Sequence, residues 1–258
     1  MRRIPDDNLA YPVLVKIGTS SGSGFFLNTP TAVYLVTAYH VLYDSSTSRP
    51  FASTAELASY PRNPADNGRN VFAVDVAALD GAGEIKTDTT RDLAVFRIAL
   101  SPEGSDTVQA LNAITIVSLS SSGILGLGIQ NVRLYADVLT SNDVFLFGYP
   151  VSLGLQHIPQ IDYTRPLLRS GIVAGKNESL KTIILDCPVY PGNSGGPVLE
   201  VEEEGFRFHF RCIGVVTQYV PAVAPVVGTA PTSGAGAIVN SGYSVAASMD
   251  GVLALAQQ

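Results

Sequence analysis

The sequence predicts an all-β fold with a short helix at its C-terminal end. Short runs rich in Val, Ile, Leu, Phe and Tyr recur along the chain, and clusters of Gly, Pro, Asn and Ser separate them. The 3.6-residue periodicity of amphipathic helices is scarce. Together these observations are typical of a barrel or a sandwich of antiparallel strands.

The strand prediction depends on a series of runs that combine β-branched or aromatic residues with flanking turn residues. In chain order they cover residues 11–18, 22–28, 32–42, 70–79, 92–100, 113–119, 131–139, 143–150, 167–175, 181–189, 195–203 and 206–219. The best helix candidate is the last segment, 242–258. There Ser248 or Asp250 can act as the N-cap before an Ala- and Leu-rich stretch.

Three long segments between these runs are expected to be loops. Residues 51–70 and 101–112 are polar, whereas 220–242 contains no Asp, Glu, Lys or Arg and is rich in Val, Ala, Pro and Gly. The uncharged segment is either an insertion on the surface or an apolar wall beside a binding cleft, because loops of this length are often functional. The acidic run 200–206 predicts a solvated hairpin tip.

Length and composition limit the possible classes of protein. The chain has 258 residues, of which 46% are hydrophobic and 15% charged, enough for one large or two modest globular domains. The formal charge of −6 argues against nucleic acid or an anionic membrane as a partner. No apolar stretch approaches the roughly 18 residues of a transmembrane helix, and no signal peptide is recognisable. We therefore expect a cytoplasmic protein.

The cysteines and histidines argue against a disulfide framework and a metal centre. Cys187 and Cys212 are the only cysteines, and they can be two free buried thiols or one bridge between neighbouring strands. His40, His157 and His209 lie far apart and lack the spacing of metal ligands. We therefore expect neither a metal ion nor a cofactor.

The stretch VYPGNSGGPVLE, residues 189–200, is the strongest candidate for catalytic chemistry. Three glycines and two prolines surround Ser194 within it. Glycines permit a strained backbone and prolines hold it rigid, so strand, bend and strand would place Ser194 at the apex. Such a bend can aim neighbouring N–H groups at one point, as nucleophilic catalysis requires. An ordinary Gly-rich turn is the alternative.

A nucleophilic serine requires a base and an orienting carboxylate. His40 ends the apolar strand in YLVTAYHVLYD, and Asp92 directly precedes the strand in RDLAVFRI. Either residue alone is compatible with a structural role. His209 lies in an alternating strand and His157 in a loop, which makes His40 the best base candidate. The order His, Asp, Ser is one of the few known for hydrolytic triads, so the three residues together indicate a hydrolase.

These motifs resemble the trypsin- and chymotrypsin-like serine proteases, and within them the HtrA-like bacterial branch. The resemblance lies in VTAYH around His40, DLAVFRI from Asp92 onward and PGNSGGP around Ser194. Further matches extend over most of the chain, namely GSGFFL, VFLFGYPVSLG, RSGIVAG, CIGVVTQY and GYSVAASMDGVLAL.

The resemblance implies two six-stranded antiparallel β-barrels of the chymotrypsin type. Residues 1–137 would carry His40 and Asp92, residues 138–258 would carry Ser194, and the site would lie in the cleft between the barrels. The implied activity is hydrolysis of peptide bonds in a protein or peptide substrate through an acyl-enzyme. The backbone N–H groups of Gly192 and Ser194 would form the oxyanion hole.

The resemblance also assigns a substrate-binding pocket. Pro188 would lie at its base, and Thr217, Gln218 and Tyr219 would form its wall. None of these side chains is charged, so a buried Arg or Lys of the substrate would lack a partner. We therefore expect cleavage after small or medium apolar residues.

Two departures from the family pattern affect regulation. Asn193 stands where the digestive members have the aspartate that pairs with a new N-terminus, and HtrA-like members share this asparagine. We therefore expect activity without proteolytic processing. We also expect no PDZ domain, so the oligomeric state and the peptide sensing of full HtrA proteins are not carried over.

Two other functions compete with a protease. A catalytically silent or partner-gated binding module of the same fold is the main alternative, although silent relatives usually lose the His or the Ser. A lipase-like esterase would have the order Ser, Asp, His and its serine in a strand–turn–helix context. Neither feature occurs here.

Overall fold

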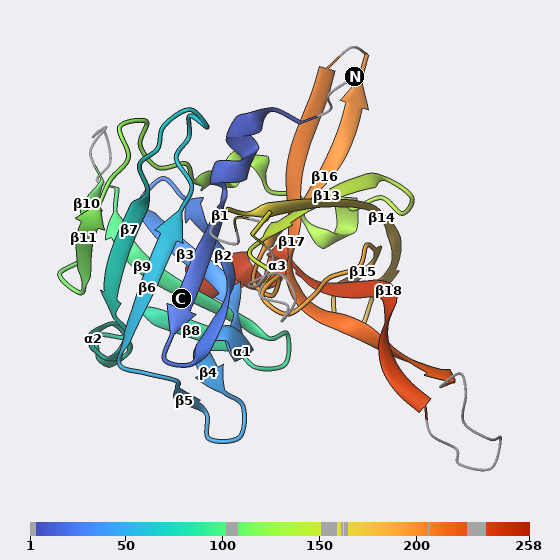
Figure 1. The fold of residues 1–258 in the computed structure, drawn as a ribbon, viewed down its shortest axis with the longest axis horizontal. Coiled ribbons are helices and arrows are strands. Elements are labelled where there is room, and N and C mark those ends of the chain that lie inside the picture. The colour runs from blue at the N-terminus through green and yellow to red at the C-terminus, as the bar shows by residue number, and fades with distance from the viewer. Residues whose placement is uncertain are drawn as a thin grey trace.

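Two β-sheets lie side by side in the computed structural model, which describes residues 4–101, 108–150, 159–160, 162, 165–205, 207–225 and 236–258. The first sheet comes from the N-terminal half of the chain and the second from the C-terminal half (Figure 1). The predicted all-β double-barrel architecture with a short C-terminal helix is confirmed. No helix in the described part of the chain has the length and apolar character needed to cross a membrane.

The first sheet is a half-barrel in which ten strands are described. Its order is β10-β9-β3-β2-β1-β6-β7-β11, with β12 on β2 and β8 on β9. It exceeds the six strands expected, in part because the short strands β8, β10 and β12 add to it. The bounds are β1 (Pro12–Ile17), β2 (Ser20–Asn28), β3 (Ala32–Ala38), β6 (Thr54–Ser59), β7 (Asn70–Asp75), β8 (Ile85–Asp88), β9 (Leu93–Leu100), β10 (Gln109–Ala110), β11 (Ile114–Ser118) and β12 (Leu127–Gly128).

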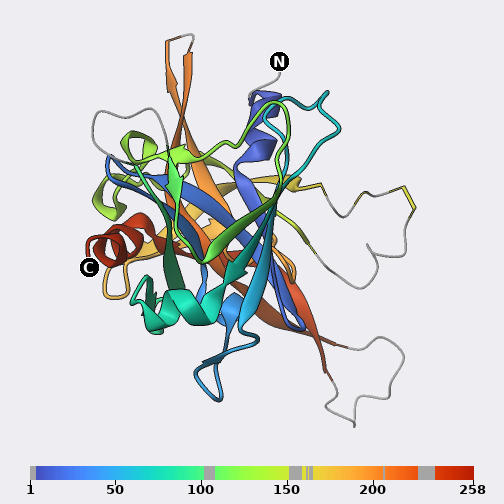
Figure 2. The same ribbon diagram turned by 90° about the vertical axis from the view of Figure 1, so that its left-hand side faces the viewer.

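The second sheet is a closed barrel in the order β13-β14-β15-β18-β17-β16. Its strands are β13 (Asp143–Gly148), β14 (Leu167–Asn177), β15 (Thr182–Asp186), β16 (Pro197–Glu204), β17 (Arg207–Pro225) and β18 (Gly236–Ser248). Closure pairs the strands on both sides and leaves no free edge in the barrel wall. The β16–β17 hairpin and the β17–β18 ribbon project from this barrel in opposite directions (Figures 1 and 2).

The remaining elements are short. They are η1 (Asp6–Ala10), α1 (Tyr39–Leu42), the β4–β5 pair (Tyr43–Asp44 and Arg49–Pro50), α2 (Val76–Gly81), η2 (Ile129–Asn131), η3 (Tyr135–Asp137) and α3 (Met249–Ala256). Ser248 occupies the N-cap position of α3 as expected, although its side chain makes no capping bond. Asp250 in the first turn accepts a hydrogen bond from the N–H of Tyr135 at 2.7 Å.

Three apolar clusters form the core. One fills the first sheet and another fills the closed barrel. The third joins residues of both sheets and of α3, including Phe25, Leu93, Phe147 and Met249, all fully buried. Because burial of apolar surface is the main favourable term in folding, this shared cluster fixes the two sheets against each other and shapes the cleft between them.

The structure corrects three of the sequence-based assignments of strands and loops. Residues 51–70 contain β6, whose Ala, Glu and Ser content hides a regular alternation of buried and exposed side chains. The predicted strand 131–139 is irregular and contains η3, because Lys176 Nζ binds the carbonyl groups of Tyr135 and Val138. Much of the predicted loop 220–242 is strand, since β17 continues to residue 225 and β18 starts at 236.

Smaller corrections concern the ends of predicted elements and the acidic run. The runs 32–42 and 70–79 end in the helices α1 and α2, and residues 109–110 of the loop 101–112 form β10. The acidic run 200–206 is not wholly solvated, because Glu200 is fully buried and bonded to Arg133 at 2.6 Å. Only the end of this hairpin, at Gly205, is a turn.

Cys187 and Cys212 are both free and buried. Burial raises the pKa of the Cys187 thiol to about 11 and that of the Cys212 thiol to about 12. Because the reactive form of cysteine is the thiolate, both side chains behave as inert apolar groups at neutral pH.

Candidate active site

His40 lies at the edge of the first sheet, in the single helical turn α1 that follows β3. Its Nδ1 is 2.6 Å from Oδ2 of Asp92, and its backbone N–H donates to Oδ1 of the same carboxylate at 3.0 Å. The carboxylate can only accept, so the proton between the two side chains belongs to Nδ1. In the neutral imidazole this tautomer has its lone pair on Nε2, the atom that can act as a base.

Asp92 occupies the turn between β8 and β9 and has a left-handed backbone with φ of 56°. Aspartate tolerates this conformation better than most residues. Its carbonyl group accepts the N–H of Tyr39 at 3.0 Å, and the register of β3 with β9 places Ala38 opposite Leu93. The His40–Asp92 pair is therefore fixed by main-chain pairing as well as by its own side chains.

Ser194 lies in the turn before β16, as the glycines and prolines predict. Pro191 and Gly192 are the central residues of a β-turn in which the N–H of Asn193 donates to the carbonyl of Tyr190 at 2.9 Å. Gly192 has φ of 91°, which is the conformation that a type II turn requires at its third residue. The sequence Pro-Gly at these positions matches the preference of that turn.

Gly195 follows the serine and cannot carry a side chain. Its φ is 87°, and an added Cβ would lie 1.9 Å from the carbonyl oxygen of Ser23 on β2. The close approach brings the serine turn of the second barrel directly against the first sheet. The backbone N–H groups of Gly192 and Ser194 donate to no group in the described residues, which leaves both available to a ligand.

The three predicted catalytic residues share one cleft of about 860 Å³ between the two sheets. It is lined by Tyr39, His40, Ser45, Ser48, Thr89, Thr90, Asp92, Val189, Tyr190, Pro191, Ser194, Thr217, Gln218 and Tyr219. The structure thus joins His40 to Asp92 directly and brings Ser194 to the same cleft. It shows no hydrogen bond between Ser194 Oγ and His40 among the described residues.

Comparison with known proteins agrees with this geometry. The family model of the trypsin-like peptidase domain matches residues 22–205, a span that includes His40, Asp92 and Ser194. The chain belongs to the trypsin-like peptidase family. The matched span runs from β2 to β16 and so includes strands of both sheets and the turn that carries the serine.

Individual relatives of this peptidase domain are distant. The uncharacterized protein y4bJ of Sinorhizobium fredii is 27% identical over 227 residues, which cover 87% of this chain and 26% of that protein. The chain therefore spans about a quarter of the length of this curated relative.

Two solved structures share the fold. The crystal structure of Deg5 has a TM-score of 0.51 and 20% identity, covering 96% of this chain and 90% of that one. The HtrA-type protease AlgW with a tripeptide also has a TM-score of 0.51, with 16% identity, and covers 98% of this chain and 63% of that one.

The predicted substrate-binding residues divide into two groups. Thr217, Gln218 and Tyr219 line the cleft of the peptidase domain. Pro188 is half-buried and is not among the lining residues. Its neighbours Val189 and Tyr190 line the cleft instead.

Among the described residues that line the cleft of the peptidase domain, all except His40 and Asp92 are uncharged. Asn193, beside the serine, is fully buried. Its Oδ1 accepts the N–H of Tyr190 at 3.0 Å, and its Nδ2 has no partner in the described residues. The guanidinium carbon of Arg169 lies 4.5 Å from the ring centroid of Tyr190, at the start of this turn.

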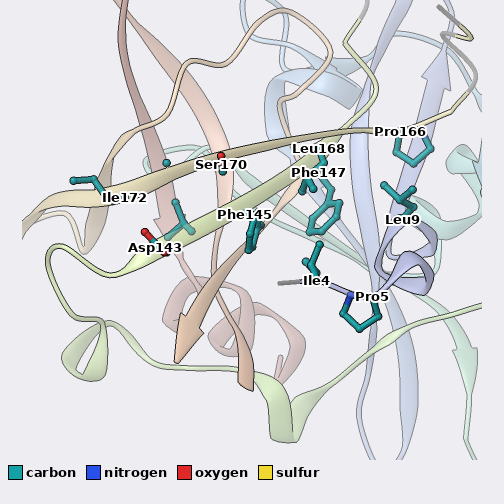
Figure 3. A pocket seen from close by; sticks show the side chains of 12 residues that line it. Ile4, Pro5, Leu9, Asp143, Phe145, Phe147, Pro166, Leu168, Ser170 and Ile172 are labelled. Atoms are coloured by element: carbon teal, nitrogen blue, oxygen red, sulfur yellow. The ribbon is translucent and has the colours of Figure 1, made fainter. Parts of the chain in front are cut away.

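A second hollow lies on the peptidase domain between η1 and the strands β13 and β14 (Figure 3). It has a volume of about 790 Å³ and an apolar lining that includes Ile4, Leu9, Phe145 and Leu168. Asp143 is the single ionisable residue in this lining. Its described lining offers one hydroxyl, that of Ser170, beside this carboxylate, and it contains no histidine, lysine or cysteine.

The described residues contain no group of three or more His, Cys, Asp or Glu that could hold a metal ion. His209 lies on β17 and is not among the residues that line the cleft, and His157 is outside the described residues. Beside hydroxyl groups and the amide of Gln218, the described lining of the cleft offers one imidazole and one carboxylate, a set that suits nucleophilic chemistry better than metal binding.

Sequence reasoning missed several residues that contact the site. Ser45, Ser48, Thr89 and Thr90 line the cleft, yet they lie in turns with no motif of their own. Ser23 was part of the GSGFFL match, but its contact with the serine turn depends on the pairing of two sheets. In the sequence, this close approach to the serine turn was indicated by the small size of Ser23 and of the glycines on either side of it.

Proposed function

We propose that this trypsin-like peptidase domain is a serine endopeptidase in which Ser194 is the nucleophile, His40 the general base and Asp92 the orienting carboxylate. The 2.6 Å contact between His40 Nδ1 and Asp92 Oδ2, in a cleft that also contains Ser194, carries the proposal. Family membership and the fold of HtrA-type structures support it.

The first half of the reaction is acylation. Ser194 Oγ attacks the carbonyl carbon of the scissile peptide bond while His40 Nε2 accepts the hydroxyl proton. Asp92 stabilises the resulting imidazolium. When the tetrahedral intermediate collapses, the C–N bond breaks and His40 gives its proton to the leaving amine. An acyl-enzyme ester on Ser194 remains.

Deacylation repeats these steps with water as the nucleophile. His40 accepts a proton from the attacking water and returns it to Ser194 Oγ, which leaves as the hydroxyl while the acid product is released. In both halves the negative oxygen of the intermediate accepts the N–H groups of Gly192 and Ser194. Each such donor is typically worth about 3–4 kcal/mol in the transition state.

The substrate would bind with its main chain beside β17. The register between β17 and β18 shifts from Val216 to Gln218, so the bulge leaves Thr217 without a cross-strand partner on β18. Bulges beside active sites commonly redirect backbone groups. The side chain of Thr217 is buried and donates to the carbonyl of Val245 at 3.3 Å, which supports a role for its main chain in pairing with the substrate.

The neutral cleft supports a preference for small or medium apolar residues on the acyl side of the cut. A cationic substrate side chain would find no carboxylate other than Asp92, which His40 already occupies. Desolvating an unpaired charge costs several kcal/mol, whereas apolar residues differ from one another by only about 1–3 kcal/mol per methylene.

Residues 1–137 and 138–258 would form the two domains, which meet just after η3.

A partner-gated or catalytically silent binding module is the second candidate. The missing hydrogen bond between Ser194 Oγ and His40 favours it, because an active triad must form that bond at some stage. In enzymes without substrate this bond is often long and shortens in the Michaelis complex. The two candidates therefore differ in whether the isolated chain turns over a peptide.

Profiling with a mixed peptide library tests the proposal. Wild type should cleave a subset of peptides after apolar residues, and Ser194→Ala and His40→Ala should lose this activity by several powers of ten while keeping the wild-type circular dichroism spectrum. Wild-type turnover by either variant would overturn the triad. A dominant Arg or Lys on the acyl side would overturn the substrate preference. Intact wild type that cleaves no peptide would favour the binding module.

A further inference from the structure

Ser23 connects the first sheet to the serine turn of the second barrel. It lies near the start of β2, and its side chain is fully buried. It does not line the cleft. It contacts the serine turn through both its hydroxyl group and its main chain.

The hydroxyl of Ser23 bridges two backbone groups of the second barrel. Oγ lies 2.6 Å from the carbonyl oxygen of Gly192, and the N–H of Tyr149 donates to Oγ at 2.9 Å. Because an N–H can only donate and a carbonyl can only accept, the hydroxyl proton must point at Gly192. The direction of this hydrogen-bond chain is therefore fixed.

This bond completes the anchoring of the peptide units around Ser194. The peptide that joins Gly192 to Asn193 is held at its oxygen by Ser23 and at its N–H by the carbonyl of Tyr190. The next peptide is held at the carbonyl of Asn193 by the N–H of Gly196 at 3.0 Å. The N–H groups of Gly192 and Ser194 have no acceptor among the described residues, and these are the donors of the proposed oxyanion hole.

Glycine makes the anchor necessary. Gly192 has no side chain that packing could hold, and its backbone can rotate more freely than that of any other residue. An oxyanion hole works only when its donors are already oriented before charge develops. A hydrogen bond to the Gly192 carbonyl supplies the restraint that a side chain would otherwise give.

Main-chain contacts keep Ser23 itself in place. Its N–H donates to the carbonyl of Ser194 at 2.8 Å, and its own carbonyl accepts the hydroxyl of Thr37 at 2.7 Å. Both bonds survive replacement of Ser23 by alanine. That replacement therefore removes the hydroxyl bridge and leaves the contact between the two sheets.

We propose that Ser23 is a positioning residue for catalysis, whose hydroxyl holds the Gly192–Asn193 peptide so that the oxyanion donors face the cleft. The inference rests on the proposed function, since it assumes that Gly192 and Ser194 supply those donors. Ser23 acts through the turn and touches neither substrate nor the reacting atoms.

The saturation kinetics of labelling by a fluorophosphonate test this role, because the phosphonyl oxygen of the adduct requires the same donors. Ser23→Ala should lower the maximal labelling rate, kinact, by about 10- to 100-fold, the usual consequence of leaving buried polar groups unpaired. The half-saturating concentration, KI, should stay within about twofold. The pH at which kinact is half-maximal should not move, because the His40–Asp92 pair is untouched.

Ser59→Ala is the matched control. Ser59 is also buried on a strand of the first sheet and accepts a hydrogen bond from Asn70 at 3.2 Å, but it contacts no part of the serine turn. Its kinact should equal that of wild type within about twofold even where its stability falls. If Ser23→Ala does not fold, Ser23→Cys retains a weak donor and should give an intermediate kinact.

The outcomes separate this inference from the proposed function. Wild-type kinact in folded Ser23→Ala, or in Ser23→Cys if the alanine variant does not fold, would overturn the positioning role and leave the triad intact. An equal loss of kinact in Ser59→Ala would overturn it as well, because the effect would then be general. A wild type that is not labelled at Ser194 would overturn the proposed function and, with it, this inference.

Discussion

Asn193→Asp places a carboxylate where the structure provides almost nothing to receive it. Asn193 is fully buried, accepts one N–H at Oδ1, and has no partner for Nδ2 in the described residues. A buried charge without a partner costs about 3–5 kcal/mol. The new carboxyl group avoids part of this cost by keeping its proton, so desolvation should raise its native-state pKa well above the usual value of about 3.9.

The sign of the resulting pH dependence follows from linkage. A carboxyl whose native-state pKa is raised binds more protons in the folded than in the unfolded state between the two pKa values. The stability of Asn193→Asp relative to the parent should therefore fall as the pH rises from about 4 through the native-state pKa. A shift of about 2–3 pKa units corresponds to a loss of about 3–4 kcal/mol.

Urea unfolding at pH 4.5 and 7.5 measures this loss, with Ser194→Ala as the parent to prevent self-cleavage. Asn177→Asp is the matched control, because the Asn177 Oδ1 accepts its hydrogen bonds at the surface and an aspartate oxygen can do the same. The control should lose less than about 0.5 kcal/mol at either pH. A stability difference for Asn193→Asp that is equal at the two pH values would refute the reasoning.

Three further substitutions test the geometry of the domain. Asp92→Asn should lower kcat by roughly four powers of ten with an intact fold, since the amide stabilises the wrong histidine tautomer. Gly195→Ala should destabilise the fold by more than about 3 kcal/mol, because its Cβ would lie 1.9 Å from a carbonyl oxygen and its φ is 87°. Arg133→Met should cost about 3–5 kcal/mol in urea unfolding, because the fully buried Glu200 loses its cationic partner and keeps the neutral donors of Leu139 and Asn142.

Matched controls accompany the two stability predictions. Gly83 has φ of 73° with open space around its Cβ position, so Gly83→Ala should cost only about 1 kcal/mol. Lys16 pairs with Glu56 at 3.4 Å with half of each side chain exposed, and Lys16→Met should change stability by less than about 1 kcal/mol. Equal losses in each variant and its control would contradict the assigned contacts. A kcat of Asp92→Asn within tenfold of wild type would contradict the role of Asp92 in orienting His40.

The fold class was predictable because the strand signals are local. Runs such as those around Val36 and Phe147 are apolar enough to be buried in any arrangement, and turn residues separate them. The strand β6 was missed because Ala55 and Leu57 alternate with polar residues of low strand propensity. Only its pairing with β1 and β7 stabilises it as a strand.

The site was predictable to the extent that its residues lie in contiguous motifs. His40, Asp92 and Ser194 each belong to a short pattern, and their order along the chain suggested a common function. Ser23 has no such pattern in relation to Gly192, since 169 residues separate the two and only the packing of the sheets joins them. Long-range hydrogen bonds of this kind leave no periodic trace in a sequence.

The most direct test of the central claim is to find which residue a fluorophosphonate modifies in the intact, unprocessed chain. Mass spectrometry of the labelled protein should locate a single adduct on Ser194, with no adduct in Ser194→Ala and strongly slowed labelling in His40→Ala. Asn193 predicts that this reaction needs no proteolytic cleavage beforehand. An unlabelled wild type, or an adduct that persists in Ser194→Ala, would contradict the account.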